Sequence, residues 1–182
     1  MGAQDDTITW RVPILHILSR TDAIDKLSQR HVFTDVISIN DVGIDPPPGV
    51  TSIPHHLCLH FDDVYTDEDA EMGFTLPQSN QIEQIIDFAH HLMGLQVMIH
   101  CFKGNSRSTA AALIVLSLHL QDERMAALLV RQIRPTAHPN QRMISLADTL
   151  LGRNGRLLGA AQILWNQQVE YARSEWIIPN LA

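Results

Sequence analysis

One segment near the middle of the chain, residues 97–108 (VMIHCFKGNSRS), restricts the possible folds more than any other. A short apolar run ends at His100-Cys101, and a loop rich in small and polar residues then leads to Arg107-Ser108. The next ten residues, 109–118, are almost wholly apolar. This pattern predicts a buried strand, a tight loop and a buried helix, with the loop at the carboxyl end of the strand.

Strand-like and helix-like segments alternate along the rest of the chain. Such alternation predicts an α/β fold with a central, mainly parallel sheet flanked by helices, and 182 residues suit a single domain. Residues 1–10 read as a polar lead-in and about 152–182 as a C-terminal extension, helical only in part. Strands are predicted at 13–18, 32–39, 56–61 and 95–100, and helices at about 21–30, 77–93, 106–120, 122–134 and 139–151.

Helix ends are predicted from capping residues. Thr21-Asp22, Asn80 with Glu83, and Asp122 are the expected N-terminal caps. Gly94 and Gly152 are the expected stops, and the segment 62–73 (DDVYTDEDAEMG) reads as an acidic loop. The helix before Gly94 is expected to bury an apolar stripe made of Ile82, Ile85, Ile86, Ala89 and Met93.

Composition excludes several classes of protein. The formal net charge of −7 argues against a nucleic-acid partner, which requires clustered lysine and arginine. No apolar run reaches the ~20 residues of a membrane-spanning helix, so no membrane insertion is expected. The acidic N-terminus does not read as a signal peptide, and two cysteines do not form a disulfide framework. We therefore expect a cytoplasmic protein.

The loop has the properties of an anion site. Backbone N–H groups between a strand end and a helix start can form a nest for an anion, and the helix dipole adds to the attraction. Gly104 permits an unusual backbone conformation, and Arg107 offers a planar, two-pronged donor to phosphate. The same N–H groups would favour the thiolate of Cys101, with Ser108 offering a hydroxyl to the sulfur. A thiolate below a bound phosphate is placed for in-line attack.

Other interpretations of this segment fit less well. A nucleotide-binding loop needs Gly-Lys-Ser/Thr, whereas the order here is Lys-Gly-Asn. A zinc site from His56, Cys58 and His60 would require ligands spread over about 13 Å of strand. A lone cysteine is often simply buried and inert, but the combination of strand, His-Cys, internal glycine, Arg-Ser and helix argues against that interpretation.

His100-Cys101-(five residues)-Arg107-Ser108 resembles the signature of cysteine-dependent protein phosphatases, and Gly104, Ser106 and Ser108 resemble the dual-specificity branch especially. The resemblance implies a phosphatase-like fold and a cysteinyl-phosphate intermediate on Cys101. Arg107 would bind the phosphoryl oxygens, and His100 would support the site. The backbone of Phe102, Lys103, Gly104, Asn105, Ser106 and Arg107 would form the phosphate loop.

The resemblance also implies a general acid upstream of the cysteine. Phe61-Asp62-Asp63 resembles the acid loop of small members of the family, which favours Asp63 as the acid, with Asp62 as the alternative. Farther along, residues 134–140 (RPTAHPN) resemble the Pro-Asn segment of the family. By analogy Asn140 would hydrogen-bond the phosphate loop, although a helix cap explains an asparagine here equally well.

The expected function is hydrolysis of phosphate monoesters without metal or cofactor, on protein phosphotyrosine and also on phosphoserine or phosphothreonine. A phosphoinositide or small-molecule phosphatase is the first alternative. The second alternative is a non-catalytic phosphate-binding module. A third is an enzyme that resembles arsenate reductases or sulfurtransferases and uses Cys58 as a second thiol. Lys103 has two interpretations: it pairs with the acidic loop, or it favours substrates with additional negative charge.

Overall fold

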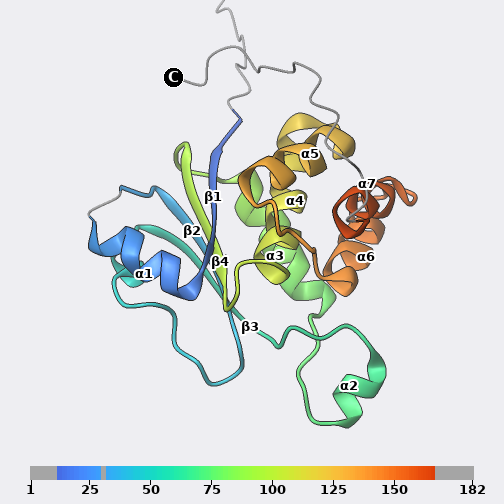
Figure 1. Ribbon diagram of the computed structural model, residues 1–182, viewed down its shortest axis with the longest axis horizontal. Coiled ribbons are helices and arrows are strands. Elements are labelled where there is room, and N and C mark those ends of the chain that lie inside the picture. The colour runs from blue at the N-terminus through green and yellow to red at the C-terminus, as the bar shows by residue number, and fades with distance from the viewer. Residues whose placement is uncertain (1–11, 30–31, 167–182) are drawn as a thin grey trace, which may run out of the picture.

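A four-stranded parallel sheet forms the centre of the computed structural model, which describes residues 12–29 and 32–166. The strand order is β1-β4-β2-β3, so β4 lies inside the sheet and β3 at one edge (Figure 1). All three pairings are parallel, which confirms the predicted α/β architecture. The strands are β1 (Ile14–Ser19), β2 (Asp35–Asn40), β3 (His55–His60) and β4 (Gln96–Cys101).

Helices cover both faces of the sheet, with one on the first face and a larger group on the other (Figure 1). The first helix, α1 (Arg20–Ser28), covers a small apolar cluster that includes Val36 and Met98. The opposite face is covered by α3 (Ser79–His90), α4 (Arg107–Leu120), α5 (Glu123–Ile133), α6 (Gln141–Leu150) and α7 (Arg156–Trp165). Two short elements, η1 (Val50–Ser52) and α2 (Asp67–Glu71), lie in loops.

The α4 helix occupies the middle of the larger layer. Every residue from Arg107 to Ser117 is buried, as the nearly uninterrupted apolar sequence predicts. Its neighbours α3, α5 and α6 instead bury one stripe each and leave the other side to solvent. Because α4 begins directly after the loop that follows β4, the loop is held between two buried elements.

Several predicted helix ends are wrong in detail. Ser19, rather than Thr21 or Asp22, caps α1, and the Asp22 side chain completes a capping box with it. Gln78 and Gln81, rather than Asn80 and Glu83, form the box of α3. Both helices begin before the capping residue that the sequence pattern predicts. The N-cap position is held instead by Ser19 in α1 and by Gln78 in α3.

The end of α3 also differs from the prediction. The helix ends at His90, before Gly94, and Met93 is 71% exposed instead of joining the apolar stripe. A β-carbon on Gly94 would lie 2.5 Å from the Thr34 side chain, so this glycine is required for close packing and not as a helix stop. Asp122 caps α5 as predicted, and Gly152 follows the end of α6.

The segment predicted as an acidic loop contains the short helix α2, which Thr66 and Asp69 start through a capping box. Part of the predicted C-terminal extension forms α7, which packs on α5 and α6 (Figure 1). The predicted polar lead-in, at residues 1–10, and the end of the extension lie outside the described residues. Within the described chain, no helix is both long and apolar enough to cross a membrane.

Candidate active site

Cys101 is the last residue of β4, and its thiol lies under the loop formed by residues 102–106, here called the phosphate loop. The residue is 2% exposed. The backbone N–H of Gly104 donates to Sγ at 3.3 Å, and Ser108 Oγ lies 3.3 Å from the same sulfur. The sulfur therefore has two polar neighbours, one from the loop and one from the first turn of α4. Gly104 thus donates to the sulfur, and the thiol faces the hydroxyl of Ser108.

Gly104 brings the phosphate loop against the corner between β1 and α1. Its φ of +74° is in the left-handed region, and a β-carbon there would lie 2.5 Å from Ser19 N. The neighbouring backbone is fixed as well, because the N–H of Arg20 donates to the carbonyl of Phe102 at 3.1 Å. The loop conformation thus depends on a glycine that the sequence pattern singled out.

Arg107 is buried, and one of its terminal nitrogens is fully occupied. Nη1 donates to the carbonyl of Phe61 and to the carboxylate of Asp41, each at 2.6 Å. Nε, by contrast, is buried with no hydrogen-bond partner in the described part of the chain. A buried donor without a partner is costly, so this nitrogen is suited to an acceptor that arrives from outside.

Asp41 was missed by the sequence analysis. It follows Asn40 at the carboxyl end of β2, and ligands of parallel sheets bind at such strand ends. The signal was therefore available in the polar pair that closes a buried strand. Arg134 and Thr136 were missed as well, and no strand end marks them, because they follow α5. Both donate to Asn105 Oδ1 at 3.0 Å and so hold the phosphate loop from the α5–α6 side.

The two candidate acids have different surroundings. Asp63 is exposed beside the phosphate loop, where its Oδ1 accepts from Ser106 Oγ at 2.6 Å and from Asn140 Nδ2 at 3.0 Å. Asp62 is instead bonded to Thr75, through both its backbone N–H and its carboxylate. The geometry therefore brings Asp63, and not Asp62, to the loop that covers Cys101.

Asn140 combines the two interpretations that the sequence left open. Its Oδ1 accepts from Met143 N–H at 3.1 Å, which caps α6, and its backbone N–H donates to the carbonyl of Ser106 at 3.3 Å. Its side-chain Nδ2 reaches Asp63 and the carbonyl of Val64. One residue thus connects a helix start, the phosphate loop and the segment that carries the candidate acid Asp63.

His100 points to the opposite face of the sheet from Cys101, because successive strand residues alternate. Its Nε2 lies 2.7 Å from Ser38 Oγ, which also lies 2.8 Å from His56 Nε2. Burial, with a smaller effect from the charges of Arg20 and His56, lowers the pKa of His100 to about 4. The imidazole is therefore neutral near pH 7, as a buried support and not as a charged group.

Lys103 and Phe102 are both exposed on the phosphate loop. The expected ion pair between Lys103 and the acidic loop is wrong, since no carboxylate among the described residues pairs with this lysine. Two acids of that loop have other partners, Asp67 with Arg142 and Asp69 with Thr66. The carbonyl of Lys103 accepts from Arg134 Nη2, which fixes the backbone on another side.

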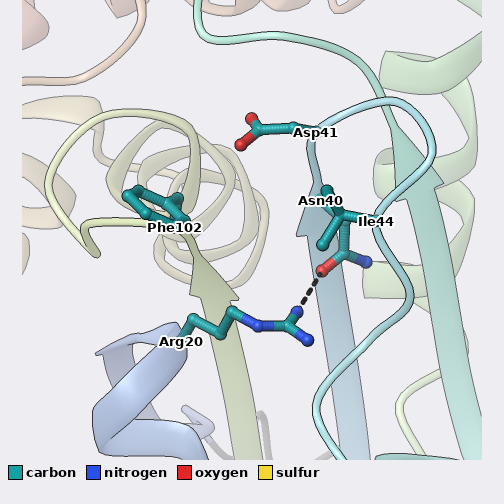
Figure 2. Close-up of a pocket in the computed structure, with 5 residues that line it drawn as sticks. All are labelled: Arg20, Asn40, Asp41, Ile44 and Phe102. Carbon is teal, nitrogen blue, oxygen red and sulfur yellow. Dashed lines mark hydrogen bonds between the residues drawn. The ribbon is translucent and has the colours of Figure 1, made fainter.

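A cavity of about 10 Å³, room for roughly one water molecule, lies between the phosphate loop and the end of β2 (Figure 2). Arg20 points into it toward Asn40, with Nη1 3.5 Å from Asn40 Oδ1, and Phe102 lies on the loop side. The same nitrogen donates to the carbonyl of Asp45 at 2.7 Å. This cation is thus held at the edge of the site by neutral oxygens.

The described residues form neither a metal ligand set nor a pair of neighbouring thiols. Within the described residues, histidine, cysteine and acidic side chains do not form a group of three that could hold a metal ion. Cys58 is on the edge strand β3, and β2 separates it from β4 and Cys101. Two strand spacings are about 10 Å, which is beyond the reach of a disulfide.

Comparison with known proteins identifies this fold. No protein-family model matches the sequence, and no curated protein sequence matches it. A structure of DUSP15 matches with a TM-score of 0.56 and 23% identity, over 85% of this chain and 92% of that one. The Yvh1 phosphatase domain from Chaetomium thermophilum matches with a TM-score of 0.54 and 19% identity, over 79% and 92%.

A third match is the human tyrosine phosphatase-like serine/threonine/tyrosine-interacting protein, with a TM-score of 0.52 and 20% identity, over 77% of this chain and 92% of that one. All three matches extend over more than three quarters of this chain. The chain therefore has the fold of dual-specificity and tyrosine phosphatases.

Proposed function

We propose that this chain hydrolyses phosphate monoesters through a thiol nucleophile, Cys101, and that its main substrate is protein phosphotyrosine, with phosphoserine or phosphothreonine also accepted. The observation that carries the proposal is the incomplete set of hydrogen-bond partners of the buried Arg107 guanidinium. Its Nη1 is fixed by two acceptors while its buried Nε lacks one. In this proposal a phosphoryl oxygen of the substrate supplies the missing acceptor.

In the first step the thiolate of Cys101 attacks phosphorus, and the bond from phosphorus to the ester oxygen breaks. Asp63, in its protonated form, gives the departing oxygen its proton. The N–H groups of the phosphate loop and Nε of Arg107 stabilise the charge on the equatorial oxygens in the transition state. The products are an alcohol or phenol and a cysteinyl phosphate.

In the second step a water molecule attacks the cysteinyl phosphate, and the bond between sulfur and phosphorus breaks. The Asp63 carboxylate takes a proton from that water, which restores the acid for the next cycle. Inorganic phosphate leaves and the thiolate is regenerated, with Ser108 Oγ beside the sulfur. No cofactor enters either step.

Other functions fit the geometry less well. An enzyme of the arsenate reductase type needs a second thiol near the first, and Cys58 is separated from Cys101 by a strand. A non-catalytic binding module has no need for Asp63 to be held against Ser106 beside the thiol. A cytoplasmic location remains part of the proposal.

Hydrolysis of para-nitrophenyl phosphate in EDTA, between about pH 5 and 8, tests the proposal. Wild-type protein should turn over the ester, Cys101→Ser should have no activity above background, and Asp63→Asn should lose the dependence on the protonated acid. Asp62→Asn is the matched control and should retain the wild-type pH profile. Turnover that persists in Cys101→Ser, or no turnover by wild-type protein that still binds vanadate, would exclude the proposed mechanism.

A further inference from the structure

A cavity of about 320 Å³ opens beside the candidate active site, and nothing in the proposed chemistry uses it. It lies between Ser106 of the phosphate loop, Tyr65, residues 138–141 and Trp165 at the end of α7. Its volume is in the range of ligand sites. Ser106 and Asn140 line this cavity and also hold Asp63, so it is continuous with the place where the leaving group would lie.

Most of the surface that lines the cavity is apolar. Trp165 is half-buried and fixed by a hydrogen bond of 2.8 Å from its Nε1 to the carbonyl of Pro139, and Tyr65 is 56% exposed on the facing loop. None of the described residues that line the cavity is a lysine or an arginine. The cavity is therefore suited to an uncharged aromatic or large apolar side chain and not to a second phosphate.

The surface next to Tyr65 is strongly acidic. The helix α2 (Asp67–Glu71), which begins two residues after Tyr65, carries four acids in five residues and buries none of them. Asp67 pairs with Arg142, whereas Glu68 and Glu71 are exposed and form no ion pair within the described chain. In Figure 1 the helix stands away from the main body, on the loop after β3. This surface attracts a lysine or arginine and repels a polyanion.

We propose that the substrate is a protein segment with two features beside its phosphorylated residue: an aromatic or large apolar side chain that enters the cavity, and a lysine or arginine that lies against Glu68 and Glu71. The inference rests on the proposed function and narrows its substrate class. It favours phosphoproteins over phosphoinositides, whose additional phosphates would approach an acidic helix instead of a cation cluster.

Binding to the Cys101→Ser variant tests this inference independently of turnover. The probes are phosphotyrosine peptides in which phenylalanine, or glycine as the control, is placed in turn at the three positions on either side, each with lysine or with glutamate as the next residue. At one or more positions, the peptide with phenylalanine and lysine should bind about tenfold more tightly than the peptide with glycine and glutamate. Fluorescence anisotropy gives the dissociation constants.

Variants of the cavity and of α2 test which residues cause the preference for phenylalanine and the preference for lysine. Tyr65→Ala and Trp165→Leu, each with Cys101→Ser, should reduce the preference for phenylalanine to within about twofold. Glu68→Lys with Glu71→Lys should reverse the preference for lysine, more at low salt than at high salt. Leu128→Ala, an exposed apolar residue on α5 outside the cavity, is the control and should change neither preference.

The outcomes separate this inference from the proposed function. Para-nitrophenyl phosphate is too small to need the cavity, so Tyr65→Ala in the otherwise wild-type enzyme should hydrolyse it at the wild-type rate. If the wild-type chain fails to hydrolyse it but the peptide preferences persist, the catalytic proposal fails and the binding proposal stands. Equal binding of all peptides, or tighter binding of a short-chain phosphoinositide than of every peptide, would overturn the inference.

Discussion

At the scale of single residues, the candidate site depends on how Arg107 is held. Asp41 and the carbonyl of Phe61 fix Nη1, which leaves the other edge of the guanidinium for a phosphoryl group. A planar cation held on one edge loses less freedom when it binds an anion on the other. Asp41 is thus a positioning residue for the proposed reaction, although it would not contact the substrate.

We expect Asp41→Asn to weaken binding of inorganic phosphate and vanadate by about three- to tenfold, because a charged acceptor of Arg107 becomes a neutral one. Competitive inhibition of para-nitrophenyl phosphate hydrolysis measures this effect. Asp87→Asn removes a carboxylate that is 78% exposed on α3 and should leave the inhibition constants unchanged. Equal constants in Asp41→Asn and wild type would show that the ion pair does not position the arginine.

Gly104 offers a second test at this scale. In Gly104→Ala the new side chain would have an unfavourable positive φ and would overlap the backbone of Leu18 and Ser19. In Gly43→Ala the φ is similar, +79°, but the added β-carbon would have no atom within 4 Å. Gly43→Ala should lower the free energy of unfolding by about 1 kcal/mol, and Gly104→Ala by about 3 kcal/mol with loss of phosphate binding. Chemical denaturation measures both losses, and equal values would contradict the packing argument.

At the scale of secondary structure, two helix caps provide a matched pair. Asn140 caps α6 and also holds Asp63, whereas the side chain of Asp122 caps α5 and has Met125 as its single hydrogen-bond partner among the described residues. Replacement of either by alanine should lower the free energy of unfolding by about 1 kcal/mol. Only Asn140→Ala should also change the pH profile of phosphate ester hydrolysis, since only this variant releases the acid. An unchanged profile would mean that the bond to Asp63 has no role in positioning.

The sequence predicts the elements better than their ends. The strand-like runs and the apolar α4 segment are correctly predicted, because burial on both sides leaves a nearly continuous apolar pattern. The alternation of strands with helices correctly predicts the parallel sheet. The caps of α1 and α3 are missed because Ser19 lies inside the strand pattern and Gln78 is a weak capping residue. The helix α2 is missed because nothing in it is buried, so it has no apolar periodicity.

The same limit applies to the candidate site. The loop from Cys101 to Ser108 is contiguous, so its spacing is visible in the sequence. Asp41, Arg134 and Thr136 contact the site only through tertiary packing of distant segments. No periodicity or short motif reports contacts of that kind, although a polar residue at the end of a buried strand is a usable signal.

At the scale of the whole molecule, buried histidines make stability depend on pH. Burial, and to a lesser extent the charges of Arg20 and His56, lowers the pKa of His100 from 6.5 to about 4, and burial also lowers the pKa of His56 and His119. Between pH 6.5 and about 4, His100 is protonated in more of the unfolded chains than of the folded chains. The free energy of unfolding therefore decreases as the pH falls from 6.5 toward 4.

For His100 alone this loss is on the order of 3 kcal/mol at full extent. Urea denaturation at several pH values should show the decrease, and His100→Asn should flatten it because asparagine does not titrate in this range. His91→Asn, at an exposed position after α3, should retain the wild-type slope. If the free energy of unfolding decreases equally with pH in His100→Asn and in wild type, titration of His100 is not the cause of the decrease.

The phosphate loop is supported from two distant parts of the chain, the β1–α1 corner at Leu18–Arg20 and the segment 134–140. Protein synthesis delivers the first support early and the second only after Cys101 has left the ribosome. An unfinished chain thus exposes a cysteine whose protective surroundings do not yet exist, and exposed thiols are open to oxidation. Once residues 134–140 dock, their contacts complete the support of the loop next to the sulfur.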